Sequence, residues 1–159
     1  MALRNVVEEG DPILRKKCRE VDVVDDRIRG ILDDMLETMR YYNGVGIAAP
    51  QVGLLKRMFI IEPEEGKVIE LINPVMVETR GSAFEDEGCL SVPGLVGTVE
   101  RPEYIRIKGL DRNGNPVEYE AEGFEATAFC HEYDHLEGIL YIDKATNIRD
   151  AEEAAEEQQ

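Results

Sequence analysis

Apolar residues near the start of the chain recur at helical spacing and predict an amphipathic helix. The stripe repeats every three or four residues, which places its members on one helix face. It consists of Ile28, Ile31, Leu32, Met35, Met39 and Tyr42. Asp25 or Asp26 is suited to cap the start of this helix, and Asn43-Gly44 is suited to end it. We therefore expect a helix that packs this stripe against the core.

Short β-like runs follow a turn-rich segment at 44–53. They lie at 57–61, 68–72, 75–79, 104–110 and 116–121. The last two runs flank Asn113-Gly114, and Asn-Gly between two such runs is a strong hairpin signal. A helical pattern returns from Phe124 to about Leu136, where Gly138 is suited to end it, and 139–142 is predicted as a final strand.

The order of these elements predicts an α+β domain. Antiparallel strands are expected to pack around a central helix in the C-terminal half of the chain, with the amphipathic helix on the N-terminal side. The chain has 159 residues, of which 43% are hydrophobic, and it contains no internal repeat and no linker. These values suit a single compact domain, which we place at residues 1–145.

The net negative charge limits the partners that the chain is expected to bind, and acidic residues are concentrated near the C-terminus. The formal net charge is −16, so binding to a nucleic-acid backbone by counterion release is not expected. Residues 150–159 include five acidic residues and no basic one. We expect the tail at 146–159 to be a solvated segment that is frayed or disordered.

The lack of a recognisable targeting segment and the small number of cysteines both favour a cytoplasmic location. No run of about 18 apolar residues is present, which argues against a membrane span, and residues 1–10 lack an apolar signal region. The three cysteines, Cys18, Cys89 and Cys130, are too few and odd in number for a disulfide framework. A free cysteine in this chain is then a candidate for metal binding or catalysis.

The segment His131-Glu132-Tyr133-Asp134-His135 is the main candidate for chemistry. On a helix, residues four apart are separated by about 40° and lie one turn above each other. Two imidazoles so placed are suited to share a metal ion, and Glu132 is suited to act as general base toward a water molecule at that ion. The simpler alternative is a charged surface helix that carries HExxH by chance.

The remaining ligand follows from a count of side chains. The only two histidines are in this motif, and an open tetrahedral site needs three protein ligands. The third must be a cysteine or a carboxylate. Cys130 adjoins His131 and points about 100° away on the helix, and Cys18 lies in a basic, surface-like stretch. Cys89 follows Gly88, which allows close backbone approach, and is the preferred candidate.

One thiolate, two neutral imidazoles and a divalent ion carry one net positive charge, which favours hydrolysis of a carbonyl group. The loop Gly44-Val45-Gly46-Ile47-Ala48-Ala49 matches the dinucleotide fingerprint formally. That interpretation is rejected, because a helix precedes the loop and Pro50 follows it. Two alternatives stay open: a tight loop without a ligand, or a cleft wall from which Gln51 donates to an oxyanion.

Three segments together resemble the peptide deformylase family. They read Gly44-Val45-Gly46-Ile47-Ala48-Ala49-Pro50-Gln51, Glu87-Gly88-Cys89-Leu90-Ser91 and His131-Glu132-Tyr133-Asp134-His135, in the family's order. The similarity runs from about Val6 to about Ala145. The resemblance implies a hydrolase that removes the formyl group from the N-terminal methionine of nascent chains.

The resemblance also implies roles for individual residues. The metal would be held by Cys89, His131 and His135, with Glu132 as general base and acid. Gln51 and the backbone N–H of Leu90 would stabilise the oxyanion. Arg101 and Asp134 are suited to a contact that steadies the helix, and a surface ion pair without function is the alternative that stays open. The substrate would contact a set made of Val45, Gly46, Glu87, Gly88, Phe124 and Ala128. Glu85 is a departure, since some relatives have an apolar residue there.

The same resemblance bears on the cofactor and partners. Ligand chemistry alone favours zinc, whereas the resemblance implies Fe²⁺ in cells, with Zn²⁺, Ni²⁺ or Co²⁺ as substitutes. The partners would be N-formylmethionyl peptides, with transient proximity to the ribosome. Some relatives dock there through a basic C-terminal helix, and the acidic tail of this chain departs from that pattern.

Three other functions compete. A general HExxH metallopeptidase would use the same helix, but such enzymes usually add a histidine or glutamate as third ligand. A structural metal module would need a fourth ligand from Cys18 or Cys130. A cysteine hydrolase built on Cys89 and a histidine would leave the paired histidines and Glu132 unexplained.

Overall fold

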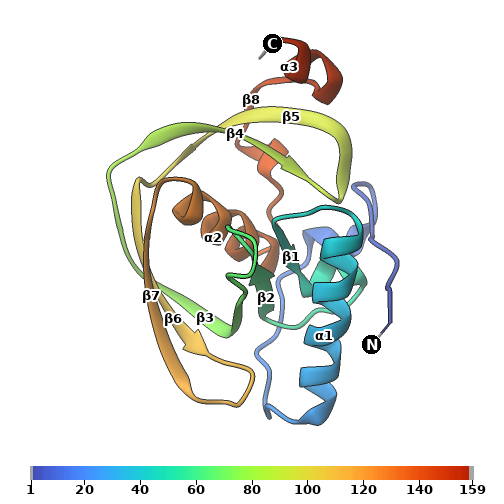
Figure 1. Cartoon of the computed structure of the whole chain (residues 1–159), viewed down its shortest axis with the longest axis vertical. Coiled ribbons are helices and arrows are strands. Elements are labelled where there is room, and N and C mark those ends of the chain that lie inside the picture. The colour runs from blue at the N-terminus through green and yellow to red at the C-terminus, as the bar shows by residue number, and fades with distance from the viewer. Residues whose placement is uncertain (1, 158–159) are drawn as a thin grey trace.

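Two antiparallel sheets and three α-helices make up the computed structural model, which describes residues 2–157 (Figure 1). The expectation of a mixed α and β fold with antiparallel sheets is confirmed. The helices are α1 (Asp26–Tyr41), α2 (Gly123–Leu136) and α3 (Ala151–Glu157). Three short 3₁₀ helices occur at Pro12–Arg15, Ala49–Val52 and Tyr141–Asp143. None of the helices in the described part of the chain has the length and hydropathy that a bilayer span requires.

The larger sheet has five strands in the order β1-β2-β3-β6-β7. Their bounds are β1 (Gly46–Ala48), β2 (Met58–Ile61), β3 (Ile69–Arg80), β6 (Tyr104–Leu110) and β7 (Pro116–Glu122). The expected hairpin at Asn113-Gly114 joins β6 to β7, and Gly114 has a φ of 80°, as such a turn requires. The runs at 68–72 and 75–79 form one strand, β3, with a register shift between Ile72 and Val75.

The smaller sheet has three strands in the order β4-β5-β8. They are β4 (Ala83–Cys89), β5 (Val92–Arg101) and β8 (Thr146–Asp150). A tight connection between β4 and β5 pairs Cys89 with Val92, after a register shift between Glu87 and Cys89. This irregular end of the hairpin is where the cysteine singled out from the sequence lies.

Helix α2 lies at the centre and contacts strands of both sheets (Figure 1). Its residues Ala126, Phe129 and Leu136 are fully buried in a cluster with β2, β3 and β6. The sequence of α2 is apolar or small on most sides, which suits a helix enclosed by protein. The central helix is therefore fixed on several sides, and residues that it carries have little freedom to move.

Helix α1 has the expected stripe and cap. The Asp25 carboxylate accepts a hydrogen bond from the Ile28 backbone N–H at 3.0 Å, which satisfies one free amide of the first turn. The stripe from Ile28 to Met39 is buried against β1 and β2. Tyr42 differs from the expectation, because it is the C-cap and its side chain is 46% exposed.

The predicted strand at 139–142 is wrong. Leu140 and Tyr141 are both buried in succession, which the alternation of a one-sided strand does not allow. The Asp143 carboxylate accepts from the Leu140 backbone N–H at 3.0 Å and closes a 3₁₀ turn instead.

The tail also differs from the expectation of a frayed or disordered segment at 146–159. Residues 146–150 form β8, whose backbone pairs with β5. An ion pair between Arg149 and Asp86, 2.8 Å apart, joins the tail to β4. In α3, Ala154 is only 6% exposed. Residues 146–150 carry one basic and one acidic residue, so the excess of acidic residues begins only at Asp150 and does not oppose strand pairing here. Residues 158–159 lie outside the described residues.

Candidate active site

Helix α2 and the end of β4 bring together three side chains of the kinds that can bind a metal ion. His131 and His135 lie one turn apart on α2, with ring centroids 5.0 Å apart. The Cys89 Sγ lies 3.4 Å from the His135 Nε2. One ligand atom from each of these three residues lies within 4.8 Å of the others. Three donors from segments more than forty residues apart thus converge on one point.

The other two cysteines lie in the core. Cys18 is 5% exposed and Cys130 is 6% exposed, so the expectation that Cys18 lies at the surface is wrong. The reason is local: the Cys18 backbone N–H donates to the Leu136 carbonyl at 2.8 Å and ties this residue to the end of α2. Burial raises the thiol pKa of both residues to about 11, which keeps them neutral and unsuited to bind a metal.

The three converging side chains fit a divalent metal ion. A thiolate and two imidazoles are a mixed soft and borderline donor set of the kind that holds zinc or iron. The His131 Nδ1 lies 2.7 Å from the Glu87 Oε1, and this hydrogen bond leaves the other ring nitrogen free to face an ion. The three-ligand arrangement also leaves a position for water or substrate.

Glu132 lies beside this cluster in a confined space. Its Oε2 is 3.9 Å from the His131 Nε2, and its Oε1 is buried without a hydrogen-bond partner among the described residues. Burial raises the pKa of this carboxyl to about 7, although His131 opposes the shift. A Cβ atom on Gly46 would overlap the Glu132 carboxylate, so a larger residue there would displace this group. A carboxyl that exchanges a proton near neutral pH is suited to acid and base work.

Gln51 is held in one orientation at the edge of the cluster. Its Oε1 accepts from the Ala48 backbone N–H at 2.9 Å, and its Nε2 donates to the Ser91 Oγ at 3.1 Å. The same Nε2 lies 3.5 Å from the Cys89 Sγ. Gln51 is 1% exposed, so its amide N–H groups are fixed next to the cysteine rather than free in solvent.

A buried chain of charged side chains is hydrogen-bonded to His131. Arg101 donates to both Glu87 oxygens, at 2.7 and 2.9 Å, and to the Asp134 Oδ2 at 2.7 Å. The Lys144 Nζ lies 3.0 Å from the same Asp134 oxygen. Burial opposes ionisation of Glu87, but the hydrogen bonds from Arg101 and His131 lower its pKa below the usual value. Glu87 therefore stays charged and orients the His131 ring.

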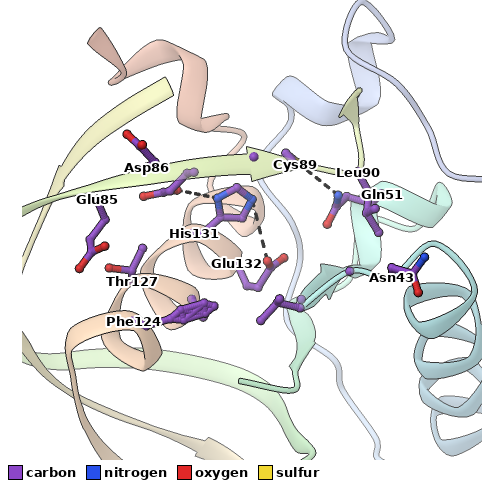
Figure 2. Close-up of a pocket in the computed structure, with 16 residues that line it drawn as sticks. Asn43, Gln51, Glu85, Asp86, Cys89, Leu90, Phe124, Thr127, His131 and Glu132 are labelled. Carbon is purple, nitrogen blue, oxygen red and sulfur yellow. Dashed lines mark hydrogen bonds and ion pairs between the residues drawn. The ribbon is translucent and has the colours of Figure 1, made fainter. Parts of the chain in front are cut away.

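These groups lie around a pocket of about 400 Å³, part of which Figure 2 shows. Its wall includes eleven of the site residues expected from the sequence: Val45, Gly46, Gln51, Glu87, Gly88, Cys89, Leu90, Phe124, Ala128, His131 and Glu132. His135 is the exception, since it lies behind the pocket wall with its Nε2 facing Cys89.

Sequence reasoning missed some of the pocket wall. Asn43, Asp86 and Thr127 also line it. Thr127 precedes His131 by four residues on α2, and that spacing places the two on one helix face. The helical spacing could therefore have found Thr127, whereas Asn43 and Asp86 depend on how the loop and β4 approach the helix.

A central helix with paired histidines, a nearby cysteine and a buried carboxyl defines the class of metal-dependent hydrolases. The family model of polypeptide deformylases matches residues 3–151. The chain belongs to this family.

Individual relatives agree with this assignment. The chain is 50% identical over 153 residues to the peptide deformylase of Acetivibrio thermocellus, an alignment that covers 96% of this chain and 89% of the relative. It is 53% identical over 144 residues to that of Alkaliphilus metalliredigens, with 91% and 97% covered.

Solved structures are also similar. The crystal structure of the Thermotoga maritima peptide deformylase has a TM-score of 0.88 and 39% identity, and covers 91% of this chain and 98% of that one. The Synechococcus elongatus peptide deformylase in complex with actinonin has a TM-score of 0.87 and 39% identity, with 91% and 79% covered. The fold described above is therefore that of the family.

Replacing Arg101 should strongly destabilise the protein. In Arg101→Met, the buried carboxylates of Glu87 and Asp134 lose their shared cation, and such a loss costs about 3–5 kcal/mol. The free energy of unfolding, measured by urea denaturation, should fall by that amount. Arg106→Met is the control, because Arg106 is 34% exposed and its ion pairs contribute at most about 1 kcal/mol. Equal losses in the two variants would contradict a special role for the buried charges.

Proposed function

We propose that this chain is a metal-dependent hydrolase that removes the formyl group from the N-terminal formylmethionine of new polypeptides and releases formate. The observation that carries the proposal is the convergence of Cys89, His131 and His135 beside Glu132 in a pocket, in a chain of the polypeptide deformylase family. A general HExxH metallopeptidase is not favoured, because the third donor is a cysteine and the relatives are peptide deformylases.

Cys89, His131 and His135 would hold one divalent metal ion. When bound, that ion supplies a Lewis acid that polarises the formyl carbonyl and lowers the pKa of a water molecule toward about 7. Glu87 would keep the His131 ring turned toward the ion through its hydrogen bond to Nδ1. Arg101 would in turn keep Glu87 charged.

Glu132 would move the proton. As a carboxylate it accepts a proton from the attacking water while the new C–O bond forms at the formyl carbon. As a carboxylic acid it returns that proton to the methionine nitrogen while the C–N bond breaks, which yields formate and a free amine. Burial favours the carboxylic acid form of Glu132 and the neighbouring His131 favours the carboxylate, so both forms are accessible for this proton transfer.

Gln51 and Leu90 would stabilise the negative charge that develops on the formyl oxygen. Gln51 is suited to this role because its Oε1 is bound to the backbone of Ala48, which fixes the direction of its amide N–H groups. Leu90 directly follows Cys89 in the pocket wall, and its backbone N–H would be the second donor. Donors fixed in advance need no reorganisation during the reaction.

The peptide would bind along β1. This strand ends the five-stranded sheet, so one of its edges is free of a neighbouring strand among the described residues. An extended substrate could pair with the backbone near Gly46 and add a strand. Val45, Phe124 and Ala128 would surround the methionine side chain, and Glu87 and Gly88 would line the cleft opposite β1.

We further propose Fe²⁺ as the ion used in cells, with Zn²⁺, Ni²⁺ or Co²⁺ as substitutes. The donor set accepts all four, and availability rather than affinity selects the metal in vivo. The substrates would be nascent chains in the cytoplasm, with transient proximity to the ribosome. The net charge of −16 argues against direct contact with ribosomal RNA.

Formate release tests the function. Anaerobically purified, metal-loaded protein should release one formate per molecule of formyl-Met-Ala-Ser, and should not cleave the internal peptide bonds of the same substrate. Formate and peptide products are measured separately, by a coupled assay and by mass spectrometry. Internal cleavage without formate would favour the general metallopeptidase instead.

Replacing Glu132 should separate metal binding from catalysis. Glutamine has nearly the same shape but cannot accept a proton at neutral pH, so Glu132→Gln should lower kcat roughly 10²–10⁴-fold. Metal content should stay near one ion per chain, because Glu132 is not among the three converging donors. A metal-replete variant with kcat within about threefold of wild type would refute the role of Glu132.

Air should inactivate the iron form selectively. Cys89 is partly exposed in the pocket, and a thiolate beside iron(II) in a water-accessible site is open to oxidation to sulfenic or sulfinic acid. Apo-protein loaded with Fe²⁺ should lose activity in air while the Ni²⁺-loaded form keeps it. Mass spectrometry of the Cys89 peptide and metal analysis report the cause. An iron form stable in air would refute this redox argument.

A further inference from the structure

Two side chains support the His131 imidazole in different ways. The hydrogen bond between its Nδ1 and the Glu87 Oε1, 2.7 Å long, is directed along the plane of the ring and does not cover either face. A second contact does so: Tyr141 stacks on the imidazole, with ring centroids 6.0 Å apart and an angle of 28° between the ring planes. That separation lies within the range of roughly 4.5–7 Å that is favourable for aromatic pairs.

Tyr141 is held in place independently of the imidazole. Its side chain is 1% exposed, and it begins a short 3₁₀ turn. The Ala145 backbone N–H donates to the Tyr141 carbonyl at 2.9 Å and closes that segment. The Lys144 Nζ lies 3.0 Å from the Asp134 Oδ2, which ties the segment to α2. Because the aromatic ring is fixed through its own backbone, it can restrain His131 rather than follow its movements.

The cysteine donor adjoins the same region. Cys89 packs against a buried cluster that consists of Leu14, Val92, Val99, Leu140 and Tyr141. Two of the three converging donors, one on α2 and one on β4, are therefore supported by Tyr141 or by the cluster that contains it. Tyr141 is not part of the pocket wall, so it does not contact a substrate bound there. Its location is that of a positioning residue.

The ring of Tyr141, and not its hydroxyl, provides this support. The hydroxyl oxygen is buried and has no hydrogen-bond partner among the described residues. Burial of a hydroxyl without a partner costs free energy, so the hydroxyl does not explain how the residue stabilises its surroundings. Phenylalanine would supply the same ring at this position.

We propose that Tyr141 is a positioning residue that helps the site to retain its metal ion, by supporting the face of the His131 imidazole and the cluster against which Cys89 packs. The proposal rests on the metal binding that the proposed function requires. Without the ring, the imidazole could tilt away from the direction in which it binds the ion. Replacement of a residue that orients a metal ligand typically lowers metal affinity by roughly 10- to 100-fold.

The test follows the release of Co²⁺ from the loaded full-length protein. Co²⁺ suits the donor set, and its visible absorption spectrum depends on the number and geometry of its ligands. Release is timed after addition of excess chelator, at a temperature at which circular dichroism shows every variant to be folded. Tyr141→Leu should release Co²⁺ about 10 to 100 times faster than wild type and alter the spectrum. Tyr141→Phe keeps the ring, so its release rate should stay within about twofold of wild type, with an unchanged spectrum.

Phe59→Leu is the matched control. Phe59 is fully buried on β2, and its ring contacts that of Phe129 at a centroid distance of 6.2 Å, in a different cluster from Tyr141. The stability of this variant to urea should fall as that of Tyr141→Leu does, because both lose a buried ring. Its release rate and spectrum should stay at the wild-type values. If Tyr141→Leu does not fold, Tyr141→Met takes its place, since the flexible methionine side chain fills irregular spaces.

The outcomes distinguish this proposal from the proposed function. Wild-type protein that binds no Co²⁺ would overturn both. Stable binding by wild type with equally slow release from Tyr141→Leu would overturn the role of Tyr141 and leave the proposed function intact. Release from Phe59→Leu as fast as from Tyr141→Leu would assign the effect to a general loss of stability, and fast release from Tyr141→Phe would assign it to the hydroxyl. Either of these results would also overturn the proposal.

Discussion

The buried charge chain from His131 through Glu87 and Arg101 to Asp134 is the constraint on which the rest of the site depends. It joins β4, β5 and α2, which are separate segments of the chain, through hydrogen bonds of 2.7–2.9 Å. A buried arginine between two carboxylates is stable only when all its partners are present. Strands β4 and β5 and helix α2 therefore hold one another in position. The His131 imidazole is fixed because it belongs to the same hydrogen-bonded chain.

The confined space around Glu132 is the second constraint. Burial of the Glu132 carboxyl raises its pKa to about 7. The backbone of β1 lies so close to this carboxyl that it requires a residue whose side chain does not displace the group. Gly46 satisfies that requirement at the start of β1. The strand that would pair with a peptide and the carboxyl that would act on it are thus fixed to each other by contact, not only by belonging to the same fold.

The sequence predicted well those features that depend on local spacing. The positions of His131 and His135 on one helix face follow from the helical repeat. Cys89 was selected by a count of possible ligands rather than by spacing, and its Sγ lies within 4.8 Å of the ligand atoms of both histidines. The Asn113-Gly114 hairpin and the stripe of α1 are also local patterns, and the structure contains both.

Features that depend on distant segments were not predicted. The burial of Cys18 results from a backbone contact with Leu136, more than one hundred residues away. The strand predicted at 139–142 is a 3₁₀ turn, because Leu140 and Tyr141 both face the interior. The parts of the pocket wall formed by Asn43 and Asp86 depend on how separate segments approach α2, so no local pattern reveals them.

Strand β8 determines which strand forms one edge of the smaller sheet. Only five residues long and bearing Arg149 and Asp150, it covers one side of β5 with a short and charged strand. An uncovered β5 would present unpaired backbone amides and carbonyls along that side, and such an edge invites pairing with another chain. The acidic residues that follow add repulsion between molecules. The described part of the chain therefore ends this sheet with a shorter and more charged edge than β5 would offer.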